Sequence, residues 1–420
     1  MKMRRFFKIF IPFALVISAA VVGYNAFSIT YHKVDMSDPD KNVDNATLIV
    51  MAYPEAICRT TEASYSDILP LIGIGKKQLI RAGHACLAIA REGCSKIEYF
   101  DNGRYIAPEG FCRVRGENTD PELRVDIEAK WEGKNLTNVE EILDWFYHHP
   151  EKTHGDGTLY AGISEIANYE ATKECVNIIQ DKNIMEYGPF ASGGTNCARF
   201  VTDAIYNGVL DKDRKEDIKN LYHFTPSGLS NIEASNSYDF YYMVDESGVH
   251  KSNKNLSLRQ IDILFDGGEG YTDYNPAGHL TAPVDVKHED SWQWLGGLGY
   301  GAWYDIEKTD NNELFKVSCY TSKGDLNYSA YYKVDPKTDH DVINDVISLA
   351  KDNNLKITYP ATFKIITLDL NGKTVTLNKT QNIFPDRPVH NCTIDDIRQI
   401  NSDSLVKAGN RDNSTELSLI

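Results

Sequence analysis

The sequence lacks closely spaced cysteine pairs and has too few basic residues to balance its acidic ones. No two cysteines are separated by only two residues, so a structural zinc site built on Cys-x-x-Cys is not expected. The 44 basic and 60 acidic residues give a formal net charge of −16. Nucleic acids and anionic lipid surfaces are polyanions that would repel such a chain, so we expect neither as its main partner.

Long apolar runs are also scarce, and the most prominent one follows the N-terminus. A short basic segment precedes the weakly polar run 9–24, an order that is typical of an export signal. The run is slightly short for a membrane span of about 20 residues. Its cleavage sites are poor, so a cleaved signal peptide and a retained anchor both stay open. We expect an exported protein in the periplasm or cell envelope, with a single inner-membrane anchor if the segment is retained.

The chain has eight cysteines, an even number that permits disulfides in an exported protein. Cys94 and Cys112 flank an apparent hairpin and could pair with each other. If all eight cysteines were paired, Cys197 would have no thiol to offer. The protein would then be a catalytically silent binding protein, which makes full pairing the main rival to any hypothesis of thiol chemistry.

Length and composition indicate a folded chain with at least two cores. The 420 residues, of which 42% are hydrophobic and 25% charged, exceed what one ordinary core accommodates. Changes in composition divide the chain into six predicted segments. These are a signal peptide or membrane anchor at 1–27, a polar stalk at 28–46, a first domain at 47–235, a linker at 236–285, a β-rich accessory domain at 286–378 and a largely disordered tail at 379–420.

Hydrophobic periodicity predicts an antiparallel sheet packed on helices in the first domain. The expected strands are 48–53, 82–91 and 96–101, and the expected helices are 136–147, 164–181 and 196–210. Thr137 followed by Glu140 suggests a capping box at the start of the first helix. In the second domain, alternating aromatic and β-branched runs predict a mostly antiparallel β fold with one helix at 340–352. The predicted fold class is therefore α+β.

Cys197 lies in the run Gly-Gly-Thr-Asn-Cys-Ala-Arg-Phe-Val and is the candidate nucleophile. Thr195 and Asn196 are good N-cap residues, which places Cys197 in the first turn of an amphipathic helix. The free N–H groups and the dipole at that position favour a thiolate and can also stabilise a tetrahedral oxyanion. Gly193 and Gly194 would let a substrate carbonyl approach the backbone closely.

His84 begins an apolar strand and is the candidate base for Cys197. A general base also needs an acceptor that orients its other ring nitrogen. If the hairpin turns about Gly93, residue 101 falls opposite residue 86, on the face that also holds His84. Asp101 is then the candidate orienting group. A register slip of one residue would transfer this role, with Glu98 or Asn102 as substitutes.

Several plainer interpretations compete with this site. A single cysteine on a helix is most often a core residue, and Cys86 could itself be the reactive thiol or pair with Cys197. Three histidines near Asp156 invite a metal hypothesis, but histidines at a helix end beside Pro150 are mostly solvated, so we expect no metal. The histidines concerned are His148, His149 and His154.

These motifs resemble the circularly permuted branch of the papain-like NlpC/P60 superfamily, which includes the lecithin retinol acyltransferase-like proteins. In that branch a Gly-His strand precedes the nucleophile, as in Gly83-His84-Ala-Cys-Leu-Ala-Ile, and the cysteine begins a helix, as in Asn196-Cys197-Ala-Arg-Phe-Val. The return strand Tyr-Phe-Asp-Asn-Gly-Arg-Tyr resembles that of exported bacterial relatives and places the third polar residue at Asp101. The resemblance covers about 47–235.

The resemblance implies a permuted papain-like first domain with Cys197, His84 and Asp101 in the catalytic roles. Substrate or oxyanion contacts are expected from Asn196, Gly194 and Tyr187, and neither a cofactor nor a metal is implied. The second domain resembles an uncharacterised β module of exported Bacteroidetes proteins. Packing or substrate presentation is the main expectation for it, with a carbohydrate platform as an alternative. The tryptophans of that platform would be Trp292, Trp294 and Trp303.

The resemblance also implies a thiol hydrolase of amide bonds outside the cytoplasm, with cell-wall peptide or another amide as the substrate. The acyltransferase members place a second histidine on the strand of Asp101, and this chain has none there. Ester or lipid acyl chemistry is thus the less favoured alternative. A silent surface binding protein and a wall hydrolase used as a toxin or in self-defence also remain open.

Overall fold

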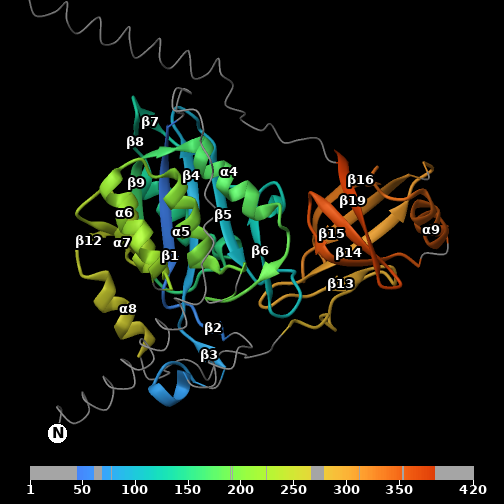
Figure 1. The fold of residues 1–420 in the computed structure, drawn as a ribbon, viewed down its shortest axis with the longest axis horizontal. Coiled ribbons are helices and arrows are strands. Elements are labelled where there is room, and N and C mark those ends of the chain that lie inside the picture. Colours follow the sequence, from blue (N-terminus) through green and yellow to red (C-terminus); the bar gives the residue numbers. More distant parts are fainter. Residues whose placement is uncertain are drawn as a thin grey trace, which may run out of the picture.

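The computed structural model describes residues 45–60, 69–76, 78–189, 191, 193–223, 225–265, 279–311, 313–351 and 354–383. The predicted signal or anchor segment, and nearly all of the predicted stalk and tail, lie outside these residues. Within the described part of the chain, no helix combines the length and apolar character needed to cross a membrane. The described residues form two domains, each built on its own antiparallel sheet (Figure 1).

The first domain is built on an eight-stranded sheet in the order β10-β6-β5-β4-β1-β9-β11-β12. Its strands are β1 (Asn45–Tyr53), β4 (His84–Arg91), β5 (Ile97–Gly103), β6 (Phe111–Gly116), β9 (Leu159–Asn168), β10 (Met185–Glu186), β11 (Tyr241–Asp245) and β12 (Gly248–Ser252). Two small ribbons pair β2 (Cys58–Arg59) with β3 (Leu79–Ile80) and β7 (Trp131–Glu132) with β8 (Asn135–Leu136). The central strands β1 and β4 are continuous apolar runs because both of their faces are covered.

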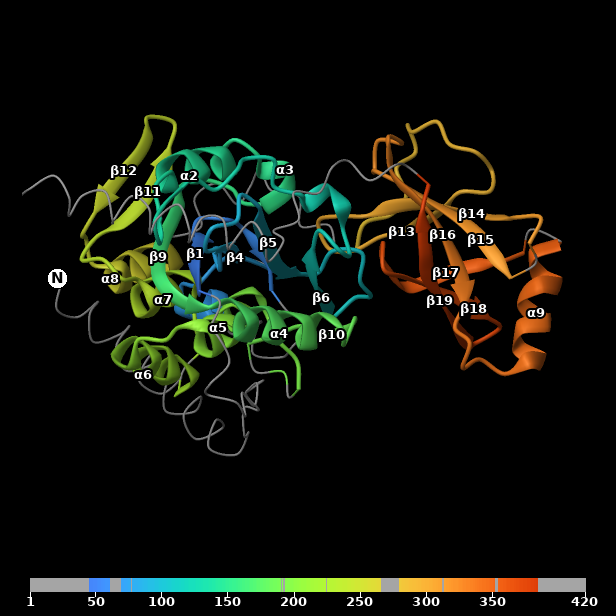
Figure 2. The same cartoon turned by 90° about the horizontal axis from the view of Figure 1, so that it is seen from above.

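Helices cover both faces of this sheet (Figure 2). One face packs against α4 (Tyr169–Gln180), α5 (Cys197–Gly208), α7 (Gly228–Ser235) and α8 (Leu256–Leu264), with α6 (Lys212–Asn220) outside them. The other face packs against α2 (Val139–Tyr147), with α3 (Pro150–Thr153) following it. The described residues also include short 3-10 helices at Leu69–Ile72, Pro121–Leu123 and Leu221–His223, which join these elements.

The second domain is a nearly closed antiparallel β structure in the order β13-β14-β15-β16-β19-β18-β17. Its elements are β13 (Gln293–Leu295), β14 (Ala302–Lys308), β15 (Leu314–Tyr320), β16 (Leu326–Val334), α9 (His340–Lys351), β17 (Lys356–Ala361), β18 (Ile365–Leu370) and β19 (Lys373–Asn382). The amide of Gln293 joins the two edge strands by bonding to Leu355 O and Ile357 N, at 2.8 Å each. Val346 and Ala350 of α9 contribute to the apolar core.

The second domain lies beside the β6 end of the first sheet (Figure 2). Backbone hydrogen bonds join the domains from Leu298 N to Arg104 O at 2.7 Å and from Phe363 N to Thr119 O at 2.8 Å. Asn327 Nδ2 donates to Glu122 Oε2 at 2.9 Å. The loop after β5, the strand that contains Asp101, is therefore in direct contact with the second domain.

The α+β fold class is confirmed, with an antiparallel sheet packed on helices and a second antiparallel β domain. The first part of the predicted linker at 236–285 is wrong, because β11 pairs with β9 and extends the first sheet. The helix predicted from residue 164 starts only at Tyr169. Residues 164–168 instead form the end of β9 and pair with β1, so sheet pairing prevails over their helical periodicity.

The predicted capping box at Thr137 is also wrong. Asn138 is the N-cap of α2, and its side chain makes no capping bond. It bonds instead to Lys130 N at 2.8 Å and Glu128 O at 2.9 Å, which ties the helix start to the preceding ribbon. The helix predicted at 196–210 is confirmed as α5, and its apolar residues Phe200, Val201, Ala204 and Ile205 are fully buried.

The packing of α5 on the sheet predicts a test of stability. Ile205 is 0% exposed in the core between α5 and the sheet, whereas Ile178 on α4 is 41% exposed. Replacing Ile205 by Ala should lower the free energy of unfolding by about 2–5 kcal/mol, because a cavity is left in a filled core. Ile178→Ala should change it by less than about 0.5 kcal/mol. Urea unfolding of both variants measures the difference, and equal effects would contradict the packing.

Candidate active site

His84 is the first residue of β4, and the glycine before it fixes that position. Gly83 has φ +72°, and a Cβ on it would lie 2.7 Å from Pro54 Cα, so another residue there would clash with the end of β1. The backbone of His84 pairs with Tyr53, and the residue is 8% exposed. The imidazole is therefore held at the end of the sheet by the two central strands.

Asp101 lies on the neighbouring strand β5, directly opposite Cys86. This is the predicted hairpin register, so neither Glu98 nor Asn102 takes its place. Asp101 is fully buried, and its Oδ2 lies 3.4 Å from His84 Nε2. That distance suits an ion pair once the imidazole is protonated.

Arg115 on β6 is the direct cross-strand partner of Asp101. Its Nε donates to Asp101 Oδ1 at 2.9 Å, and its Nη2 donates to Oδ2. Tyr99 OH also donates to Oδ2, at 3.1 Å. Burial alone would raise the pKa of Asp101, but the charge of Arg115 and the bonds from Arg115 and His84 lower it well below its usual value. The carboxylate is thus ionised despite its burial.

Cys197 is the first residue of α5 and is half-buried with a free thiol. The side chain of Asn196 caps the helix by accepting from Arg199 N at 2.9 Å. Burial tends to raise the pKa of Cys197, but the hydrogen bond and charge of His84 and the backbone N–H groups of Ala85 and Ala198 lower it. The thiolate is favoured by the histidine and the helix start together.

The pKa of His84 is raised, in the opposite direction to the lowered pKa of Cys197. Burial would lower the pKa of His84, but its contacts with Asp101 and Cys197 outweigh burial and raise the pKa to about 9. Because Nε2 faces Asp101, we infer that Nδ1 faces the thiol. The electrostatics favour an imidazolium–thiolate pair over the two neutral groups. A thiolate beside a proton donor can attack a carbonyl carbon and protonate the group that leaves.

The other three predicted residues, Asn196, Gly194 and Tyr187, make different contacts. The side-chain oxygen of Asn196 is occupied in capping α5. Gly194 packs against β10, since a Cβ there would lie 2.3 Å from Glu186 O. Tyr187 stacks under the guanidinium of Arg104, with Cζ 4.7 Å from the ring centroid, and its pKa is raised by burial and by nearby Cys197. Their predicted roles toward a substrate stay predictions.

The free cysteines other than Cys197 in the described part of the chain have raised rather than lowered pKa values. Cys86, Cys112 and Cys319 are buried with free thiols, and burial raises the pKa of each. Full burial and a raised pKa disfavour Cys86 as the reactive thiol, and its predicted pairing with Cys197 is wrong because both thiols are free. The pairing of Cys94 with Cys112 is wrong too, because Cys112 is not in a disulfide. Full pairing of the eight cysteines is excluded on the same grounds.

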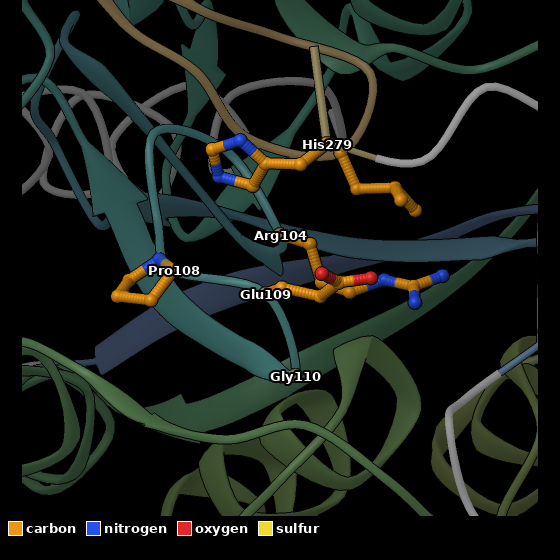
Figure 3. Close-up of a pocket in the computed structure, with 6 residues that line it drawn as sticks. Arg104, Pro108, Glu109, Gly110 and His279 are labelled. Atoms are coloured by element: carbon orange, nitrogen blue, oxygen red, sulfur yellow. The ribbon is translucent and has the colours of Figure 1, made fainter.

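A small pocket lies near the site, between the domains (Figure 3). It is lined by Arg104, Pro108, Glu109, Gly110, His279 and Leu298. Arg104 connects this pocket to the site because its guanidinium covers Tyr187. Among the described residues, no three His, Cys, Asp or Glu side chains are grouped as metal ligands would be.

Sequence reasoning missed Arg115 and Tyr105. The guanidinium of Arg115 lies over the Tyr105 ring, with Cζ 3.8 Å from the ring centroid, and the Tyr105 ring meets the His84 ring edge-on with centroids 6.3 Å apart. A signal for Arg115 was present: two arginines alternate with small and apolar residues in Phe-Cys-Arg-Val-Arg-Gly, where burial demands acidic partners. Nothing local identified Tyr105, whose chain neighbours Arg104 and Ile106 form backbone hydrogen bonds with the second domain.

The fold and the site define an α+β protein in which a half-buried cysteine at a helix start lies beside a buried histidine–aspartate pair on the sheet. Residues 48–214, which include all three, match a family model described as type VI secretion system effector TseH-like. Residues 292–380 match the model of the DUF6695 C-terminal domain. The crystal structure of a type VI secretion system effector, TseH, is 13% identical with a TM-score of 0.31, covering 50% of this chain and 98% of that chain. No curated protein matches.

The site geometry predicts a consequence for Asp101→Asn. Without the carboxylate, the imidazolium of His84 loses its stabilising charge, so the pKa of Cys197 should rise toward its ordinary value. Alkylation of Cys197 by iodoacetamide at pH 6, followed by peptide mass mapping, should slow several-fold. Asp203→Asn is the matched control, because Asp203 is a buried carboxylate bonded to Tyr222 OH at 2.6 Å. An unchanged rate in Asp101→Asn would show that Asp101 does not support the pair.

Proposed function

We propose that the protein is an exported cysteine hydrolase that cleaves amide bonds, with cell-wall peptides as its substrates. The observation that supports this most directly is the placement of Cys197 at the start of α5 and of His84 Nε2 3.4 Å from buried Asp101, which lowers the pKa of Cys197 and raises that of His84 to about 9. Thiol hydrolases need this combination at neutral pH, whereas a structural cysteine in a core does not. The match to a secretion-system effector family adds support for a hydrolase.

In the first half of the proposed reaction, the Cys197 thiolate attacks the carbonyl carbon of the amide. A tetrahedral oxyanion forms, and the N–H groups at the start of α5 are placed to stabilise it, since the first turn of a helix has no internal acceptors. The His84 imidazolium then gives its proton to the leaving amine as the carbon–nitrogen bond breaks. The product is an acyl group attached to Cys197 as a thioester.

In the second half, neutral His84 takes a proton from a water molecule, whose oxygen attacks the thioester carbon. The sulfur leaves as thiolate, the imidazolium is restored and the carboxylic acid departs. The sum is amide plus water giving carboxylic acid and amine. Throughout both halves Asp101, held by Arg115 and Tyr99, keeps the imidazole in place and stabilises its charged form.

The family match favours the hypothesis that the protein is a wall hydrolase directed against other cells, because the matched family is described as secretion-system effectors. The match bears on how the protein is delivered and on its target, and it leaves the proposed chemistry unchanged. Ester or lipid acyl chemistry remains the alternative, and it is less favoured because the strand of Asp101 offers no second histidine. Export is proposed on the basic and apolar segment before residue 28, which would be either a cleaved signal peptide or a single retained anchor.

Loss of either catalytic group should abolish turnover. Cys197→Ala removes the nucleophile and His84→Gln removes the proton carrier, so release of new amino groups from purified peptidoglycan should fall by at least about 1000-fold. Cys319→Ala, which removes a buried thiol of the second domain, should retain activity. Mass spectrometry of the muropeptides identifies the bond cut. Turnover that survives in Cys197→Ala would refute the mechanism.

The raised pKa of His84 predicts the alkaline limit of activity. The imidazolium is the proton donor, and the charged form exists below its pKa, so activity is lost as pH rises through that value. We expect kcat/KM to fall above about pH 9 as a single proton is lost, rather than near pH 6.5, the ordinary pKa of histidine. A pH series on a soluble muropeptide measures the limit. A fall centred near 6.5 would mean that His84 is not paired with the thiolate.

A further inference from the structure

One short stretch belongs to both domains. Residues 104–106 leave β5 just after Asp101, and Ile106 is 3% exposed within the apolar core of the second domain. Ile106 has φ +46°. A β-branched residue is rarely found in this left-handed region and stays there only when its surroundings fix it. The surroundings here are the side chains of the other domain.

The backbone on either side of Tyr105 is held by the second domain. Leu298 N donates to Arg104 O at 2.7 Å, and Ile106 N donates to Tyr300 O at 3.5 Å. This approach requires glycine at 297, because a Cβ there would lie 2.4 Å from Ile106 N and 2.6 Å from Arg104 O. Residue 105 is therefore clamped between two interdomain contacts.

The ring of Tyr105 points the other way, into the thiol site. It lies under Arg115 and beside His84, and Gly103 leaves room for it, since a Cβ on Gly103 would lie 2.1 Å from the ring. His154 stacks on Tyr105 with centroids 4.7 Å apart, and Tyr300 contacts His154 at 5.4 Å. A row of rings thus leads from the second domain to the catalytic histidine.

We propose that the second domain is a positioning element of the thiol site, acting through Ile106 and Tyr300 to hold Tyr105 against Arg115 and His84. The proposal rests on the proposed function in requiring a reactive Cys197. Tyr105 covers the Arg115–Asp101 pair and keeps water from it, and charge interactions are stronger where water is excluded. If the ring is loosened, the field at His84 weakens and the thiolate becomes less favoured.

The test uses the full chain and needs no substrate. The rate of Cys197 alkylation by iodoacetamide is measured from pH 4 to 10 in the wild type, Ile106→Ala and Tyr300→Ala. We expect the rate at pH 6 to fall about tenfold in both variants, because less thiolate is present. The conservative variants Ile106→Val and Tyr300→Phe, which keep the core contact and the ring, should restore the wild-type profile.

Ile366→Ala is the matched control, because Ile366 is a buried isoleucine of the same core but lies on β18. It should lower the melting temperature without changing the pH profile. Equal profiles in the wild type and Tyr300→Ala would overturn the proposal, as would an equal shift in Ile366→Ala. Tyr300→Ala decides the matter if Ile106→Ala does not fold. A wild-type Cys197 that titrates as an ordinary thiol would overturn the proposed function as well.

Discussion

The buried ion pair of Asp101 and Arg115 is the interaction on which the site depends. Both side chains are almost fully withdrawn from water, at 0% and 1% exposure, and removing two charges from water costs several kcal/mol each unless their bonds are restored. Here two bonds from Arg115 and one from Tyr99 restore them. As a result the Asp101 carboxylate stays charged in the interior, and this negative charge stabilises the protonated form of His84.

The charges alternate across the sheet and onto a helix. Arg115, Asp101 and His84 lie on the adjacent strands β6, β5 and β4, and Cys197 follows at the start of α5. Each group stabilises the charged form of the next one. The arrangement holds only in one register, because a slip of one residue between β5 and either neighbour would turn a side chain to the opposite face. Sheet pairing and electrostatics therefore support each other.

The features of the fold and site that could be predicted from the sequence are those set by residues close together in the chain. The length of the hairpin between β4 and β5 set Asp101 opposite Cys86, and the Thr-Asn cap set the start of α5. Arg115 was missed because Asp101 was considered only as the group that orients His84, and not as a buried carboxylate that needs a cation to neutralise it. The first domain was also taken to end too early, since β11 returns to pair with a strand about 80 residues earlier in the chain, and no local pattern reveals such a return.

Tyr105 was missed because its direction depends on an unusual backbone conformation at the neighbouring Ile106, which is buried in the second domain. Consecutive residues of a strand point to opposite sides, and the left-handed backbone at Ile106 redirects the chain where β5 has ended. One side chain enters the core of the second domain while its neighbour enters the thiol site. If Ile106 returned to an ordinary backbone conformation, one of these two placements would be lost. Docking of the second domain and covering of Arg115 are therefore coupled through a single peptide unit, so a thiol domain of this kind would carry its β partner as part of the site.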